Sequence, residues 1–339
     1  MKNKAIFLDR DGTINVNTHY VNHPNQVEIL PNVIPALKIL KKLGYLLIII
    51  TNQSGIARGY FKESDLKKVN NRLFKLLKKE DIYIDDLFYC PYHTQALLPQ
   101  FKKDSSCRKP KPGMIFEAAK KHNIDISQSY MIGDMASDIG AGINAKCRAS
   151  ILVHNTSVEQ KNIRPTYKAK NLLEAAVWIS RDTQKQKILS LKEIQIISNK
   201  LHKKRKKIVL TNGVFDLIHP GHINFLRLSK KLGDVLIVGV NSDASVKKNK
   251  GPTRPINKEQ HRIELLAALN FVDYIVVFNQ KTPVKLVETV KPHFHIKDDT
   301  YSVDKIVEYK AVVRNGGQVI RFPRITEFAS SNIIQKMQK

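Results

Sequence analysis

Short apolar runs alternate with longer amphipathic stretches along the first half of the chain. Runs of this length are typical of buried strands, and the stretches between them repeat apolar residues at helical spacing. Strands are expected at residues 5–8, 45–51, 86–90, 129–132 and 149–153, and helices at 34–43, 63–80, 114–122 and 136–144. This alternation predicts a parallel sheet with helices on both faces.

The same alternation restarts in the second half. Strands are expected at 208–211, 235–240, 274–278, 294–296 and 318–322, and helices at 222–232, 258–268, 283–290 and 305–315. Between the halves, 181–204 carries spaced Ile and Leu among Lys, Gln and Arg, the pattern of a linker with one amphipathic helix. We therefore predict an α/β fold with two Rossmann-like parallel-sheet domains, 1–180 and 205–339, joined by this helical linker.

Composition predicts an enzyme of the cytoplasm. A chain of 339 residues with 42% hydrophobic content can form two cores. Its longest wholly apolar run, 45–50, is far too short to cross a bilayer, so no membrane insertion is expected. The first residues lead into a strand rather than a signal peptide. Cys90, Cys107 and Cys147 are too few for a secreted disulfide framework.

The net charge of +27 raises the question of nucleic-acid binding. Lysine is spread along the whole sequence, however, and no groove-reading motif is present. The basic run at 203–207 is interpreted as a solvated surface just ahead of a strand. Positive charge also steers phosphorylated substrates toward an enzyme. We therefore expect small anionic substrates rather than nucleic acid.

Two aspartates follow the first expected strand. Open parallel sheets bind ligands at the carboxyl ends of their strands, and Asp9 and Asp11 lie there, with Gly12 allowing the chain to turn. One carboxylate can attack phosphorus while the other protonates the leaving oxygen. Because two carboxylates repel a phosphate, this chemistry requires a divalent cation, and Mg²⁺ is suited to it.

Further polar positions complete this first site. Thr51 and Asn52 end the second strand, Lys109 lies in R-K-P, and Asp134 opens the D-x-x-x-D that follows the fourth strand. With D-x-D-G-T, T-N-Q-S-G-I-A-R-G and C-R-K-P-x-P-G-M, residues 1–180 resemble the haloacid dehalogenase-like phosphatases. Among these they look most like the heptose 1,7-bisphosphate 7-phosphatases, and next like the histidinol phosphatases.

The resemblance implies a role for each of these residues. Asp9 would be the nucleophile and Asp11 the general acid/base. Asp9, the backbone carbonyl of Asp11, and Asp134 would hold Mg²⁺. The residues expected to bind phosphate are Thr51, Asn52 and Lys109, and Arg108 is expected to contact the sugar phosphate.

One segment departs from the pattern of these relatives. They carry a structural zinc loop that reads C-x-H and then C-x-C ahead of R-K-P, whereas Tyr92 and Ser105 stand here at one histidine and one cysteine position. Cys90, His93 and Cys107 leave three ligands, and structural zinc normally takes four. Structural zinc is therefore not expected, and the two cysteines are interpreted as small core residues.

A pair of histidines follows the first strand of the second half. His219 and His222 flank Pro220-Gly221 at the start of an expected helix. A helix N-terminus offers free amides and partial positive charge to phosphates. Two imidazoles there can donate hydrogen bonds to a phosphate as it becomes five-coordinate. No protein nucleophile is needed, because the acceptor's own phosphate attacks the α-phosphorus of the nucleotide.

Residues 205–339 resemble the cytidylyltransferase-like nucleotidyltransferases, and most of all heptose 1-phosphate adenylyltransferase domains. The supporting motifs are N-S-D-A-S-V-K, G-x-x-R-P-I-N, E-Q-x-R-x-x-x-L-A-A-L, N-G-G-Q-V and S-S-N-I-I. The resemblance makes His219 and His222 transition-state stabilisers. It implies nucleotide or phosphate contacts from Phe215, Lys250, Arg262, Ser330 and Ser331. The chain reads K-D-D-T-Y at 297–301 where relatives have K-G-G-D-Y, which leaves base and sugar preference open.

Together the resemblances imply a bifunctional enzyme of ADP-heptose synthesis, and so of carbohydrate metabolism and lipopolysaccharide precursors. It would remove the 7-phosphate of heptose 1,7-bisphosphate through an aspartyl-phosphate, with Mg²⁺, and then transfer AMP from ATP to heptose 1-phosphate, releasing pyrophosphate. A separate sugar kinase would supply the bisphosphate. The alternatives are a phosphatase/cytidylyltransferase for another sugar or polyol phosphate, and a nucleic-acid 3'-phosphatase. The anomer and the oligomeric state, a homodimer included, are left open.

Overall fold

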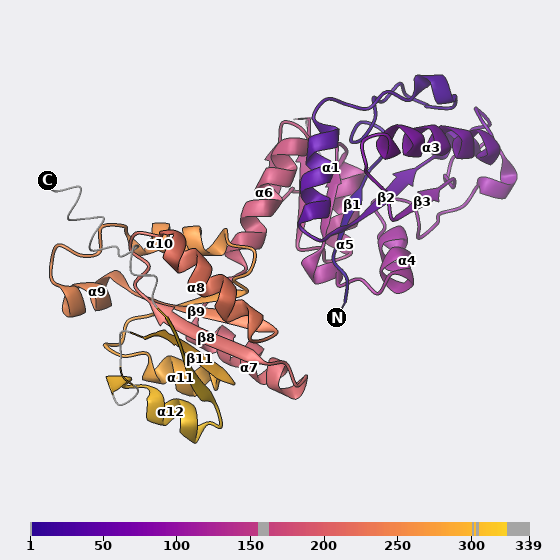
Figure 1. Cartoon of the computed structure of the whole chain (residues 1–339). Coiled ribbons are helices and arrows are strands. Elements are labelled where there is room, and N and C mark those ends of the chain that lie inside the picture. The colour runs from indigo at the N-terminus through magenta and orange to yellow at the C-terminus, as the bar shows by residue number, and fades with distance from the viewer. Residues whose placement is uncertain (1, 155–162, 300–301, 303–304, 324–339) are drawn as a thin grey trace, which may run out of the picture. The chain divides into compact units, whose positions relative to one another are not determined.

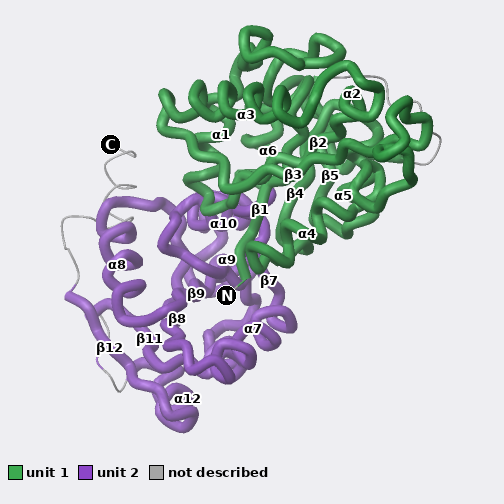
Figure 2. Tube along the Cα trace, turned by 90° about the vertical axis from the view of Figure 1, so that its right-hand side faces the viewer, with its two compact units in different colours: residues 1–181 green, residues 182–339 purple. Residues whose placement is uncertain are grey.

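The computed structural model describes residues 2–154, 163–299, 302 and 305–323 (Figure 1). The chain divides into two compact units, Met1–Arg181 and Asp182–Lys339 (Figure 2). Each unit is built on its own parallel sheet with helices on both faces. The predicted α/β class with two Rossmann-like sheets is therefore confirmed. No described helix combines the length and the apolar character that crossing a membrane requires.

The sheet of the first unit has the strand order β3-β2-β1-β4-β5-β6, and its paired strands are parallel. The strands are β1 (Ala5–Leu8), β2 (Leu46–Asn52), β3 (Asp86–Cys90), β4 (Tyr130–Gly133), β5 (Ala149–Val153) and β6 (Tyr167–Ala169). The order reverses direction between β1 and β4, so the topological switch point lies at the carboxyl end of β1. This is where the first predicted site falls.

Helices bury apolar side chains against both faces of this sheet. They are α1 (Val33–Lys42), α2 (Ser54–Ala57), α3 (Glu63–Lys78), α4 (Gly113–Lys121), α5 (Ala136–Asn144) and α6 (Leu172–Lys185), with the 3-10 turns η1 (Pro24–Gln26), η2 (Pro99–Phe101) and η3 (Ile126–Gln128). Successive side chains of a strand point to opposite faces. Ile6 and Leu8 therefore join the core under α1, α3 and α6, while Ala5 and Phe7 join the core under α4 and α5.

The sheet of the second unit has the order β12-β11-β8-β9-β10-β7, again with parallel pairs. The strands are β7 (Ile188–Leu189), β8 (Ile208–Gly213), β9 (Val235–Asn241), β10 (Tyr274–Phe278), β11 (Phe294–Asp298) and β12 (Gln318–Phe322). The helices are α7 (Leu191–Lys203), α8 (Pro220–Lys231), α9 (Asp243–Lys250), α10 (Glu259–Ala267), α11 (Val284–Val290) and α12 (Tyr309–Arg314). Residues of α8 and α10 join one core, and residues of α7, α11 and α12 the other.

The segment predicted as a linker contributes two elements to the second unit. β7 pairs with β10, with Ile188 opposite Ile275, and so forms one edge of the sheet. α7 begins at a capping box made by Ser190 and Glu193. Its Ile194 is fully buried in the core beside α11. A two-residue strand is too short to show periodicity, and its partner lies far along the chain, so the sequence pattern revealed only the helix.

Candidate active sites

The carboxyl edge of the first sheet gathers the residues predicted for the first site. Asp9 follows β1, Thr51 and Asn52 end β2, and Asp134 follows β4. A cavity of about 290 Å³ opens at this edge. Its lining includes Asp9, Asp11, Thr51, Asn52, Arg108 and Lys109. Residues that are distant in sequence therefore surround one space large enough for a phosphorylated substrate group.

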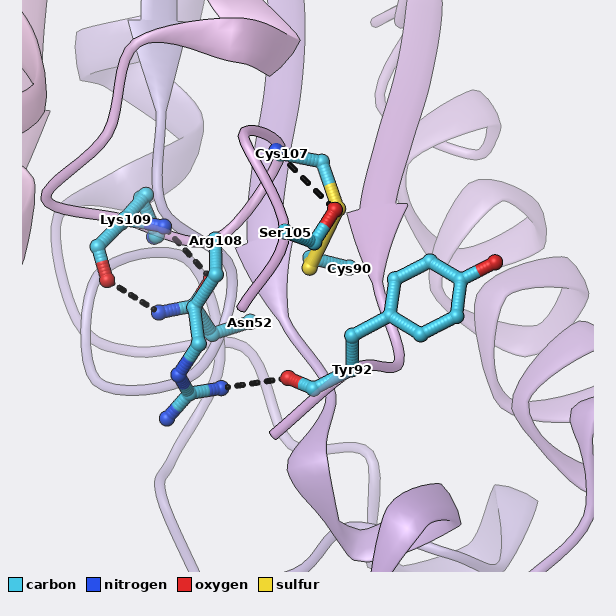
Figure 3. The surroundings of a disulfide bond; sticks show 7 residues. All are labelled: Asn52, Cys90, Tyr92, Ser105, Cys107, Arg108 and Lys109. Atoms are coloured by element: carbon cyan, nitrogen blue, oxygen red, sulfur yellow. Dashed lines mark hydrogen bonds between the residues drawn. A yellow bond between two sulfur atoms is a disulfide. The ribbon is translucent and has the colours of Figure 1, made fainter. Parts of the chain in front are cut away.

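Lys109 lies at the centre of this site. Its ammonium contacts Oδ1 of Asp9 and Oδ1 of Asp138, both at 2.6 Å, and donates to the carbonyl of Ile50 at 2.9 Å. The Asn52 side chain accepts from the Lys109 N–H at 3.0 Å and donates to the Lys109 carbonyl at 3.1 Å (Figure 3). Asn52 is predicted to bind phosphate, whereas in the structure both ends of its amide hold the lysine loop in place.

Three buried carboxylates form a group that could hold a metal ion. Asp9, Asp134 and Asp138 offer ligand atoms that lie within 4.8 Å of one another. Burial raises the pKa of Asp9 to about 8, and the charges of Asp138 and Asp134 add to the rise while Lys109 opposes it. Burial and then Asp138 raise the pKa of Asp134 to about 6. A divalent cation would relieve this repulsion, so the donor set fits Mg²⁺.

Lys109 offsets part of this negative charge. Burial by itself lowers the pKa of Lys109, but the adjacent carboxylates of Asp138 and Asp9 outweigh it and hold the pKa above its usual range. The lysine therefore stays charged at neutral pH. One cation between two carboxylates, with a third nearby, still leaves the group with excess negative charge.

The carboxylate of Asp11 is held apart from this group. It accepts from Nη2 and Nε of Arg10 at 2.7 and 3.0 Å, from Asn15 at 2.9 Å and from Gln53 at 2.9 Å. The sequence did not single out Arg10, which is fully buried and also donates to Asn70 at 2.7 Å. These donors fix the orientation of Asp11 at the cavity wall, where a fifth of its side chain is exposed.

Asp138 is a site residue to which the sequence analysis assigned no role. It lies in the first turn of α5, and its Oδ2 accepts from the N–H of Met135 at 2.9 Å. Gly133 makes its position feasible, because a Cβ there would lie 2.3 Å from the Cβ of Asp138. Gly12 has the same function for Asp134, since it has φ +84° and a Cβ on it would meet Oδ2 at 2.2 Å. The i, i+4 spacing from Asp134 was the signal for Asp138.

A disulfide joins Cys90 at the end of β3 to Cys107, two residues before Lys109 (Figure 3). Cys90 is fully buried in a core and Cys107 packs against that core, in agreement with their interpretation as small core residues, and the link between them was not predicted. Nδ1 of His93 accepts instead from the N–H of Gln95 at 2.9 Å, and no group in the described residues brings His93 together with both sulfurs. The sequence could not show this pairing, because it depends on loop 91–106 folding back.

The second site lies at the carboxyl end of β8. His219 and His222 stand at the start of α8 with their rings stacked, 3.8 Å between centroids and 29° between planes. The ring of Phe215 lies 5.4 Å from that of His222. Phe215 has φ +50°, and this left-handed turn directs the chain from the strand into the histidine segment. The two imidazoles thus lie beside the free amides of a helix start.

The other residues predicted to contact the nucleotide differ in how deeply they are buried. Lys250 is exposed at the end of α9. Arg262 is fully buried, and its guanidinium donates to the carbonyls of Asn257, Val214 and Asn241. The structure thus gives Arg262 a framework position instead of an open contact surface. Ser330 and Ser331 lie outside the described residues.

A buried polar chain that the sequence did not reveal lies beside this site. Glu308 accepts from Nε2 of His295 at 2.9 Å and pairs with Lys297 at 2.5 Å, and Lys297 donates to Asn212 at 3.0 Å. Burial raises the pKa of Glu308, but the His295 hydrogen bond and Lys297 outweigh it and lower the pKa to about 2. Burial lowers the pKa of His295. The chain therefore holds a neutral imidazole and a Glu–Lys ion pair at neutral pH.

Comparison with known families assigns each unit a class. Residues 106–175 match the family model described as HAD-hydrolase-like, and residues 210–336 match the model described as cytidylyltransferase-like. The fold and site of the first unit are accordingly those of a haloacid dehalogenase-like phosphatase. The second unit is a cytidylyltransferase-like nucleotidyltransferase domain.

Individual relatives define the first unit further. The chain is 46% identical over 151 residues to D-glycero-beta-D-manno-heptose-1,7-bisphosphate 7-phosphatase of Haemophilus influenzae, covering 44% of this chain and 82% of that protein. It is 42% identical over 149 residues to the enzyme of the same name from Escherichia coli K12, covering 44% and 78%. The chain belongs to this family of heptose bisphosphate phosphatases, with a nucleotidyltransferase domain fused behind it.

A solved structure resembles the first unit as well. It is D,D-heptose 1,7-bisphosphate phosphatase from B. bronchiseptica, complexed with magnesium and phosphate, with a TM-score of 0.48 and 28% identity. The match covers 53% of this chain and 99% of that one.

Proposed function

We propose that this enzyme removes the 7-phosphate from heptose 1,7-bisphosphate and then transfers AMP from ATP to the resulting heptose 1-phosphate. The observation that carries the proposal is the identity of 42–46% to heptose bisphosphate phosphatases over a unit whose carboxylate–lysine site is complete. The fused nucleotidyltransferase domain supplies the chemistry that uses the remaining phosphate. A separate sugar kinase would provide the bisphosphate, and all three steps would take place in the cytoplasm.

The phosphatase step follows from the positions of the two aspartates. Lys109 holds Oδ1 of Asp9, so we assign the attack on phosphorus to Oδ2, which forms an aspartyl-phosphate. Asp11, oriented by Arg10 and Gln53, donates a proton to the leaving oxygen and then takes one from the hydrolytic water. Bound Mg²⁺, held by Asp9, Asp134 and the Asp11 carbonyl with Asp138 adjacent, would neutralise the negative charge gathered here.

A guanidinium group on the cavity wall suits a substrate with a second phosphate. Arg108 lines the cavity, and its Nη1 donates to the carbonyl of Tyr92 at 3.2 Å. Burial, and then the nearby charge of Arg58, lower the pKa of Arg108. Like charges held close together favour an anion between them, and guanidinium groups match phosphate oxygens well. Arg108 is therefore the residue that we expect to bind the second phosphate of a bisphosphate substrate.

The transfer step uses no protein nucleophile. The phosphate of the sugar attacks the α-phosphorus of ATP and pyrophosphate leaves. The stacked His219 and His222 donate hydrogen bonds to the oxygens of the phosphoryl group as its phosphorus becomes five-coordinate, assisted by the amides that open α8. The basic segment 247–254 would bind the β- and γ-phosphates.

One observation favours a second candidate donor. Asp298 ends β11 beside Lys297, and Asp299 follows it, where related sequences carry glycines. Two carboxyl groups at this edge change the hydrogen-bonding available to a base. A cytidylyltransferase acting on the same or another sugar phosphate is therefore the alternative, and a panel of ATP, CTP, GTP and UTP separates the two.

The test is product analysis by mass spectrometry with heptose 1,7-bisphosphate, ATP and Mg²⁺. We expect ADP-heptose from the native enzyme, bisphosphate unchanged with Asp9→Asn, and heptose 1-phosphate accumulating with His222→Ala. Asp104→Asn and His261→Ala, two exposed surface changes, serve as matched controls that keep both steps. Absence of phosphate release by the native enzyme would refute the assigned sugar, and release without nucleotide transfer would refute the assigned acceptor or donor.

A further inference from the structure

Two loops at the carboxyl edge of the second sheet are fastened together by Asp216. Its Oδ1 accepts from the N–H of Asn257 at 2.8 Å and its Oδ2 from the N–H of Ile256 at 3.1 Å. Oδ2 also pairs with Arg254 at 2.8 Å. The Asn257 amide donates to the carbonyl of Asp216 at 2.6 Å. The turn that carries the histidines is thus bound to the loop 251–258, which lies some distance along the chain between α9 and α10.

Arg262 also joins the same two loops, through hydrogen bonds to backbone carbonyls. From the first turns of α10, its guanidinium donates to the carbonyls of Asn257 at 3.1 Å, Val214 at 2.6 Å and Asn241 at 2.8 Å. It also pairs with Asp243 at 2.8 Å. Asn257 is shared, because its N–H and side chain bind Asp216 while its carbonyl binds Arg262.

These contacts face the interior of the unit. The Asp216 side chain is 2% exposed, against a fifth for Asp11, and both of its carboxylate oxygens bind groups of the loop, so Asp216 does not reach a substrate in this arrangement. Removing one partner of a buried hydrogen-bonded ion leaves the others unsatisfied. The contacts of Asp216 with Arg254, Ile256 and Asn257, which together form a clasp, therefore strongly favour one loop position. That loop adjoins Lys247, Lys248 and Lys250 at the end of α9 and contains Arg254.

We propose that Asp216 is a positioning residue: it holds the loop 251–258 against the histidine turn, and so sets where the basic residues 247–254 meet a nucleoside triphosphate. The proposal rests on the nucleotidyl transfer proposed above. The pairing of Arg254 with Asp216 forms between residues of this chain and needs no nucleotide. The loop is therefore ordered before the triphosphate binds, so the free energy of binding does not have to offset the conformational entropy lost on ordering the loop.

The first test reads the loop position without any substrate. Full-length native enzyme and Asp216→Asn are treated with a limiting amount of trypsin, and cleavage between Lys250 and Gly251 is followed by mass spectrometry. We expect cleavage at this bond to be faster by about tenfold in Asp216→Asn, as loss of roughly one well-formed charged contact implies. Equal cleavage rates overturn the proposal, whatever the enzyme's true substrate.

Asp234→Asn is the matched control. Asp234 also accepts a backbone N–H, that of Lys207 at 2.8 Å, and pairs with a lysine, Lys206, at 2.9 Å. Asp234 directly precedes β9 and lies beside the amino end of β8, at the opposite edge of the same sheet. Faster cleavage after Lys250 in this control as well would mean general loosening of the unit, which contradicts a local clasp.

The second test separates positioning from catalysis. With the substrates of the proposed transfer, we expect Asp216→Asn to raise KM for the nucleotide by about tenfold while kcat changes by less than about threefold. In combination with Arg254→Gln the two effects should be less than additive, because Arg254 and Asp216 are paired with each other. A lowered kcat at constant KM, or full additivity, refutes the positioning role. If the native enzyme transfers no nucleotide, the proposed function fails and the trypsin result alone decides the inference.

A milder variant covers the case in which Asp216→Asn unfolds the unit. Asn257→Ala deletes only the bond from the Asn257 amide to the Asp216 carbonyl. It should shift cleavage after Lys250 and the nucleotide KM in the same direction by about threefold, with an unchanged melting temperature for the first unit. No shift in either quantity counts against the clasp.

Discussion

The first unit surrounds a single lysine with acidic groups, whereas the second unit compensates its buried charges pair by pair. Asp9, Asp134 and Asp138 share Lys109 as their close cation. In the second unit, Asp216 pairs with Arg254 and Arg262 with Asp243, each at 2.8 Å, and Glu308 pairs with Lys297 at 2.5 Å. The first site therefore suits an added cation, whereas the second places two imidazoles at the start of a helix.

Lys109→Met should have the largest effect, because it removes the cation that pairs with both Asp9 and Asp138. Uncompensated carboxylates in a buried site cost about 3–5 kcal/mol of unfolding free energy. Phosphatase activity should fall at least about a thousandfold, since Lys109 also orients Asp9. Urea unfolding and phosphate release measure the two effects. Lys111→Met, at a half-exposed neighbour, should change neither, and an active Lys109→Met enzyme would contradict the assignment.

Glu308→Gln should test the paired charges of the second unit. Glu308 has a folded pKa of about 2 against 4.5 ordinarily, so its ionised form stabilises the fold by roughly 3 kcal/mol above pH 4.5, and this is lost as pH falls toward 2. The variant should lose a similar amount of unfolding free energy at pH 7. Its unfolding free energy should also fall less steeply than that of the native protein as the pH is lowered. Glu288→Gln, a change to an exposed ion pair on α11, is the control. If the unfolding free energy of the variant fell as steeply at low pH as that of the native protein, this would be evidence against the stabilising contacts assigned to Glu308.

The pH dependence of Mg²⁺ binding should further distinguish the acidic site of the first unit from the paired charges of the second unit. Without the cation, Asp9 titrates near 8 and Asp134 near 6, both above their unfolded values. The folded first unit then binds more protons than the unfolded chain between pH 4 and 8, so its stability falls as pH rises through this window. Mg²⁺ must displace these protons. Its stabilising shift in melting temperature should therefore be a few degrees larger at pH 8.5 than at pH 6.

An equal Mg²⁺ shift at both pH values would show that the carboxylates are already ionised. Asp134→Asn is the internal check, because it removes one titrating group and should reduce both the shift and its pH dependence. The second unit should show no comparable dependence on Mg²⁺ in the absence of nucleotide.

The smallest effect on phosphatase activity is expected from opening the disulfide. Cys107→Ser opens the link to Cys90, but Asn52 still holds the Lys109 peptide at both its N–H and its carbonyl. We expect phosphatase activity to change by less than about threefold while unfolding free energy falls by roughly 3 kcal/mol, the value for a loop of this length. Cys147→Ser is the control. A thiol assay that finds three free thiols in the native protein would refute the link itself.

Sequence reasoning predicted residues for both sites that the fold places at the carboxyl edges of the two sheets, because these residues end strands or open helices. Asp9, Asp134 and His219 each follow an apolar run, and parallel strands bring such positions to one edge. The sequence did not show which acidic side chain pairs with which basic side chain. The link between Asp216 and Asn257, or between Glu308 and Lys297, joins loops that only the tertiary fold brings together. Arg262 illustrates the limit: its motif placed it at the site, but its burial and its carbonyl partners decide what it does there.

The edge strand β7 also determines where the two enzymes can be separated. A fragment that begins at residue 205 would lack β7 and α7, leaving the edge of β10 unpaired and the core around Val276 uncovered. Exposed strand edges of this kind promote aggregation. A fragment that begins at 182 keeps Ile188 and Ile194 in place and presents a complete sheet. A nucleotidyltransferase half of this protein should thus be made from residue 182 onward, even though its recognisable motifs begin after residue 205.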